Sequence, residues 1–159
     1  SGDCCPGYFG GSCISSYTVP AGKNLYITDI IYGVDFVNVN NCPPISLKIN
    51  GVIVHSYYSG GTWGTNTWTP DLTLIASEGD ILTAELGGWG AHHSNASNQI
   101  SITAFLVDKI VDGIVLTANY TVPISKNLVL FNNTSYPEVY GSGTVVTVSS
   151  NRYGYLIDN

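Results

Sequence analysis

The chain has 159 residues, of which 44% are hydrophobic and 10% are charged, and its formal net charge is −6. This length fits one domain, or a domain with an appendage, and is long enough to bury a core. The low charged content excludes an all-helical protein, because solvated helices need many Glu and Lys side chains. Five Lys and Arg against eleven Asp and Glu leave no basic cluster, which argues against nucleic acid as a partner.

No apolar run approaches the roughly 18 residues of a membrane span, so we expect no transmembrane segment. The four cysteines are Cys4, Cys5, Cys13 and Cys42. Their even number and their crowding near the N-terminus favour disulfides in an oxidising compartment. Ser rather than Met at position 1 fits removal of a secretion signal or a trimmed chain. We therefore expect a secreted protein that is extracellular or at the cell surface.

The pairing of the cysteines stays open between two schemes. Cys4 and Cys5 are adjacent, and a bridge between neighbours closes a strained ring, so their internal partners would be Cys13 and Cys42. In one scheme, two internal bridges fasten the N-terminus to the loop around Cys42. In the other, one or more cysteines bridge to another chain. A zinc site is disfavoured, because two residues normally separate paired thiolate ligands.

Residues 1–16 are rich in Gly, Pro, Cys and Ser without periodicity, which predicts a flexible N-terminal arm. Alternating apolar residues then predict strands over 17–23, 24–32, 45–49, 52–55, 72–76, 80–86 and 99–107. Asn50-Gly51 is a strong hairpin signal, and Glu78-Gly79-Asp80 predicts a turn. Short strands at this spacing predict an all-β fold, with a jelly-roll-like antiparallel β-sandwich over 17–109.

The end of the chain repeats part of this pattern. Residues 120–128 match residues 17–25 at seven of nine positions, 141–148 echo 77–84, and 155–158 echo 105–108. The copy lacks the region of the Asn50-Gly51 hairpin, so 112–159 is predicted to be a partial β repeat. So short a sheet is marginal alone, and we expect it to pack on the first unit or on a neighbouring chain. A homo-oligomer or polymer is the corresponding expectation.

The residues that could support catalysis or bind a metal are sparse. The histidines are His55, His92 and His93, and no nucleophile elbow or phosphate-binding loop occurs. We expect no enzyme, no cofactor and no metal site. Three alternatives stay open: a metal held by His55 and a loop histidine, calcium at 35–41 or 95–99, and glycosidase chemistry by paired carboxylates. The candidate carboxylates are Asp35, Asp71, Glu78 and Glu85.

Aromatic side chains gather in segments rich in Gly, Ser, Thr and Asn, which we predict to be loops. They are Tyr57, Tyr58, Trp63, Trp68 and Trp89. Such rings either cover the ends of a sandwich and form subunit contacts, or stack on sugar rings beside polar side chains. They are therefore candidates for an interface or for a carbohydrate- or receptor-binding site.

Two resemblances follow from these motifs. The run from Tyr17 through the Lys48-Ile49-Asn50-Gly51 hairpin to Lys109 resembles jelly-roll modules of bacterial surface and fibre proteins. Cys4-Cys5 with Cys13 on an arm ahead of a sandwich is similar to the connector of bacterial endospore appendage subunits. That resemblance implies an arm that forms disulfides with neighbouring subunits.

The combined expectation is a structural, self-assembling subunit of an extracellular filament or surface fibre, linked through its cysteine arm. The alternative is a carbohydrate- or receptor-binding module that uses the loop aromatics, with a cell-surface glycan as its partner.

Overall fold

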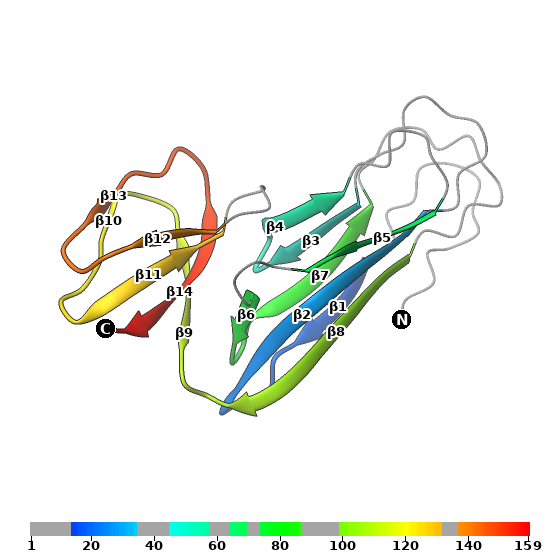
Figure 1. Cartoon of the computed structure of the whole chain (residues 1–159), viewed down its shortest axis with the longest axis horizontal. Helices are drawn as coiled ribbons and strands as arrows, with labels where there is room; N and C mark the ends of the chain where they lie inside the picture. The colour runs from blue at the N-terminus through cyan, green and yellow to red at the C-terminus, as the bar shows by residue number, and fades with distance from the viewer. Residues whose placement is uncertain (1–13, 35–44, 58–63, 70–73, 87–98, 132–136) are drawn as a thin grey trace.

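The structure is a computed structural model that describes residues 14–34, 45–57, 64–69, 74–86, 99–131 and 137–159. These residues form strands and turns, with no helix among them. Two packed sheets make a first unit, and a smaller second unit lies beside them (Figure 1). The strand pairs are antiparallel. The predicted all-β antiparallel sandwich with a C-terminal partial repeat is confirmed.

Sheet A of the first unit has the strand order β1-β7-β3-β4. Its strands are β1 (Ile14–Thr18), β7 (Ile81–Leu86), β3 (Ile45–Ile49) and β4 (Val52–Tyr57). β3 and β4 form the predicted hairpin, in which Asn50 and Gly51 have φ angles of 51° and 78°. Both residues thus adopt the left-handed backbone that this turn requires. β1 begins at Ile14, inside the segment predicted to be an arm.

Sheet B is built on β2 (Lys23–Val34), the longest strand. β8 (Gln99–Asp108) pairs along one side of β2. On the other side, β6 (Leu74–Ser77) pairs with the beginning of β2 and β5 (Gly64–Trp68) with its end. β5 was not predicted, because Gly-Thr-Asn-Thr-Trp carries almost no apolar alternation. The prediction that Trp68 lies in a loop was therefore wrong, since it ends a strand.

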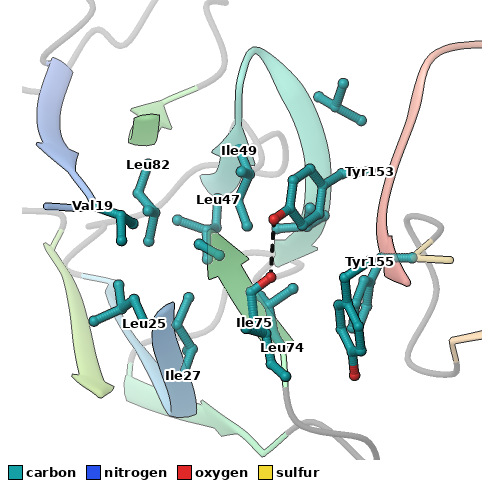
Figure 2. Packing of buried hydrophobic residues seen from close by; sticks show 14 of the residues in the cluster. Val19, Leu25, Ile27, Leu47, Ile49, Leu74, Ile75, Leu82, Tyr153 and Tyr155 are labelled. Atoms are coloured by element: carbon teal, nitrogen blue, oxygen red, sulfur yellow. Dashed lines mark hydrogen bonds between the residues drawn. The ribbon is translucent and has the colours of Figure 1, made fainter. Parts of the chain in front are cut away.

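Apolar side chains from the facing sides of the two sheets fill the space between them (Figure 2). β2 contributes the fully buried hydrophobic residues Ile27, Ile30 and Tyr32 to this core. The step from Ile27 to Ile30 is three residues instead of two because the pairing with β8 shifts between Ile27 and Asp29, as at a β-bulge. Each fully buried Ile or Leu stabilises the fold by roughly 1.5–3 kcal/mol relative to an exposed one.

The second unit contains sheets C and D. Sheet C has the order β12-β11-β14-β9, and sheet D pairs β10 with β13. The strands are β9 (Asp112–Leu116), β10 (Tyr120–Thr121), β11 (Lys126–Leu130), β12 (Glu138–Tyr140), β13 (Val145–Val146) and β14 (Arg152–Asp158). One face of sheet C packs on sheet D around Leu128, Leu130 and Val146. Its other face, with Phe131 and Tyr155, joins the core of the first unit.

Five strands of the second unit reproduce strands of the first in the same register. β10, β11, β12, β13 and β14 correspond to β1, β2, β6, β7 and β8. For example, Leu25 is opposite Leu106 in the first unit, and its counterpart Leu128 is opposite Leu156 in the second. β3, β4 and β5 have no counterpart among the described strands. β9 has no counterpart among the described strands of the first unit.

The turns of the two units use matching hydrogen bonds. The N–H of Val19 donates to the carbonyl of Asp80 at 3.0 Å, and the N–H of Val122 donates to the carbonyl of Thr144 at 2.9 Å. The ion pair between the first residue of β2 and the last of β8 spans 2.7 Å, and the one between β11 and β14 spans 2.6 Å. The sequence repeat is therefore also a structural repeat.

Candidate functional site

Most residues predicted to form a site lie outside the described residues. They are Cys4, Cys5, Cys13, Cys42, Tyr58, Trp63, Trp89, His92, His93, Asp35 and Asp71. Of the candidate aromatics, the structure describes the side chain of Tyr57, and it places the backbone of Trp68 opposite Ile30. The predicted disulfides and the predicted aromatic ligand site stay predictions.

His55 and Tyr57, both on β4, meet Tyr32 of β2. The Tyr32 hydroxyl lies 2.7 Å from Nδ1 of His55, and the Tyr32 ring stacks on Tyr57 with the centroids 5.5 Å apart. Burial lowers the pKa of His55 to about 4 and raises the pKa of Tyr32 above its usual range. At neutral pH the imidazole is therefore uncharged. In this cluster Tyr57 is partly buried and serves to join sheet A to sheet B.

Two of the four candidate carboxylates are described, and both are held in ion pairs. Glu78 accepts a hydrogen bond from the Gly22 N–H at 2.6 Å and pairs with Lys109 at 3.0 Å. The Gly22 N–H and then Lys109 lower the pKa of Glu78. Glu85 pairs with Lys48. Within the described ranges, no three His, Cys, Asp or Glu side chains are grouped to hold a metal ion.

The junction between the two units is organised around the hydroxyl of Tyr153, on β14. This side chain is fully buried. Two oxygens accept from its hydroxyl, Oδ2 of Asp80 at 2.5 Å and the carbonyl of Ile75 at 3.0 Å (Figure 2 shows the bond to Ile75). Asp80 also accepts from the Ser77 N–H at 2.6 Å and from the Asn50 amide at 2.6 Å. Burial, followed by the charge of Asp80, raises the pKa of Tyr153. Tyr153 thus ties β14 to β6 and to the turn before β7.

A second polar group at the junction holds the segment that connects the units. The fully buried Asn24 side chain accepts hydrogen bonds from the N–H groups of Ile110 and Val111 at 2.6 and 3.0 Å. Its amide donates to the Val111 carbonyl at 3.0 Å and to the Ser77 hydroxyl at 3.2 Å. The Ser77 hydroxyl donates to the same carbonyl at 2.9 Å. These bonds fix the connection between β8 and β9.

The outer edge of β8 differs from the outer edge of its counterpart β14. β14 pairs with β11 on one side and with β9 on the other. Among the described strands, β8 pairs with β2 alone. β8 presents large apolar side chains to solvent, since Phe105 is 51% and Leu106 44% exposed. Within the described ranges, the repeat thus covers this edge in the second unit and leaves it unpaired in the first.

Sequence reasoning missed Asn24, Asp80 and Tyr153 as functional positions. Asn24 carried a signal, because the shared motif of the repeat keeps Lys-Asn-Leu with the Asn at 24 and at 127. Tyr153 carried none, since its partners lie 73 and 78 residues away in sequence. Long-range contacts of this kind follow from packing rather than from local pattern.

No family model, curated protein or solved structure matches this sequence. Within the described part of the chain, no helix has the length and apolar character needed to cross a bilayer.

Proposed function

We propose that this chain is a structural, self-assembling subunit of an extracellular filament or surface fibre. The observation that carries the proposal is the outer edge of β8, which no described strand covers and which is 10 residues long and apolar at Ile102, Phe105 and Leu106. Proteins that stay monomeric usually protect such an edge with Lys, Pro, a bulge or a covering segment. β8 contains no Lys, Arg or Pro. An exposed edge with these properties favours pairing with another chain.

The junction supports the same proposal because it makes the two units one body. Tyr153 and the Asn24 cluster connect the second unit to the first through buried hydrogen bonds. A subunit whose parts do not rotate can transmit a fixed geometry from one contact to the next, which a regular fibre needs. The cysteine arm would add covalent links between neighbours, as its resemblance to appendage connectors implies.

The experiment is sedimentation velocity over a range of protein concentrations, with electron microscopy of the most concentrated sample, with and without reductant. We expect association that grows with concentration and persists in part under reductant, because strand pairing does not require disulfides. The double variant Ile102→Lys/Leu106→Lys should reduce this association, since charged side chains at an edge oppose pairing. Ile124→Lys is the matched control, because Ile124 is 87% exposed in a turn. A monomer at all concentrations in both conditions would contradict the proposal.

A further inference from the structure

The two units differ at two edges, and each unit shows how the other's open edge can be covered. In the second unit β9 covers β14, whereas its counterpart β8 has β2 as its single partner among the strands that the structure describes. In the first unit β3 covers β7, with Leu82 opposite Ile49. The counterpart β13 pairs with β10 alone among the described strands, because the β3–β4 hairpin is missing from the repeat. In the described part of the chain, β1 and β10 lack a neighbour on the same side in both units, so β8 and β13 are the edges at which the units differ.

Backbone groups of β13 face this open side. In the first unit, the Ile81 N–H donates to Asn50 Oδ1 and the Ile81 carbonyl accepts from the Asn50 N–H, both at 2.9 Å. Val145 holds the position of Ile81 in the repeat and is 63% exposed. Because N–H and C=O groups alternate in direction along a strand, the groups of Val145 and Thr147 point to the side that β3 would occupy. This edge can therefore accept a strand.

We infer that β8 of one copy pairs with the β13 edge, residues 145–148, of a second copy. The inference rests on the proposed function and names the contact through which the subunits assemble. Neither edge is protected: residues 141–151 contain no charged residue and no Pro, and Asp108 is the single charged residue of β8.

The side chains of the two edges also match. On β13, Val146 points into the core of the second unit, and Val148 packs against that core from just beyond the strand. On β8, Ile102 and Leu106 are opposite the buried Ile30 and Leu25 of β2, and therefore lie on the inner face at the edge. Pairing would place these partly exposed apolar residues beside Val146 and extend both cores.

A joint between two different edges is heterologous and leaves one free β8 and one free β13 edge at the ends of each assembly. Where the rotation between neighbours does not close a ring, subunits can be added at both ends, as a filament requires. A joint between two copies of β8 would be two-fold and would close after two chains. It would also leave β13 uncovered.

The test uses two blocked variants of the full chain under reductant, so that none of the four cysteines contributes. The β8-blocked variant carries Ile102→Lys and Leu106→Lys, and the β13-blocked variant carries Val145→Lys and Thr147→Pro. Each retains the edge that the other lacks. Thermal unfolding confirms that each variant is folded, and Val145→Lys alone replaces the double variant if the proline prevents folding.

We expect each blocked variant alone to lose assembly and an equimolar mixture to form a complex of one chain of each. Gain of association on mixing cannot come from misfolding of one variant, because neither associates alone. Two results overturn the inference while leaving the proposed function intact. The first is that the β13-blocked variant forms dimers by itself, which indicates a joint between β8 strands. The second is that the mixture forms no complex although the wild type assembles. A wild type that is monomeric under reductant overturns the inference, and one that is monomeric both with and without reductant overturns the proposed function itself.

Discussion

Removing one buried hydroxyl at the junction should weaken the whole fold measurably. Tyr153→Phe keeps the ring and creates no cavity, but it removes the hydroxyl that lies 2.5 Å from the buried Asp80 carboxylate. A hydrogen bond to a charged group contributes about 2 kcal/mol, and here the carboxylate loses one of its partners without access to water. We expect the free energy of unfolding to fall by about 2 kcal/mol, and the midpoint of thermal unfolding by about 4–8 °C.

The assay is denaturant unfolding followed by far-UV circular dichroism. Tyr17→Phe is the matched control, because it makes the same chemical change at a side chain on β1 that is 44% exposed. The control should stay within about 0.5 kcal/mol of the wild type. If Tyr153→Phe is no less stable than Tyr17→Phe, the hydroxyl does not connect the units in the way described.

Three further predictions use other parts of the structure. The pKa of His55 is about 4 in the folded state against the usual 6.5, so protons bind the unfolded state first, and the free energy of unfolding should fall by up to about 3 kcal/mol as the pH drops from about 6.5 through 4. Urea unfolding at a series of pH values should show this dependence in the wild type and not in His55→Gln. The same pH dependence in both proteins would refute the prediction. Asn24→Ala leaves buried N–H groups unpaired and should lower the free energy of unfolding by about 3 kcal/mol. Asn127 is the partly exposed copy of this residue, and Asn127→Ala should lower it by less than about 1 kcal/mol. Equal losses of the two variants in chemical denaturation would contradict the role of Asn24 in holding the connecting segment. Gly154→Ala would place a Cβ 2.3 Å from the Val129 carbonyl oxygen and should lower the free energy of unfolding by about 3 kcal/mol. The Cβ of Gly22→Ala meets no atom within 4 Å, so this variant should lose only about 1 kcal/mol, for the φ of +70°. Thermal unfolding that ranks the two variants in the opposite order would argue against the close approach at Gly154.

Local sequence patterns predicted the parts of the fold that local physics determines. The Asn50-Gly51 pair predicted its hairpin because both residues tolerate positive φ, and β3 has the predicted bounds of 45–49. The repeated motif predicted the second unit because turns with equivalent hydrogen bonds close the equivalent strands. These features need few long-range contacts.

Other features could not be read from the sequence because distant packing determines them. β5 pairs with β2 despite a polar sequence, since the neighbouring strand supplies its hydrogen bonds. The contact between Tyr153 and Asp80 joins residues in different units and leaves no periodic signal. The pairing of β8 and β13 along one side only, among the described strands, depends on strands distant in sequence and leaves no local pattern.

The buried polar group around Asn24 has a mechanical consequence. A pulling force applied between the two units acts first on residues 109–111, which connect them. There the N–H of Lys109 donates to the Gly22 carbonyl. The side chains of Asn24 and Ser77 form hydrogen bonds with the N–H and carbonyl groups of Val111. Bonds arranged in parallel must break together, so the load passes directly to β2 and β6 in sheet B. The connection between the units therefore bears tension as a fixed joint, and extension of the molecule should begin elsewhere in the chain.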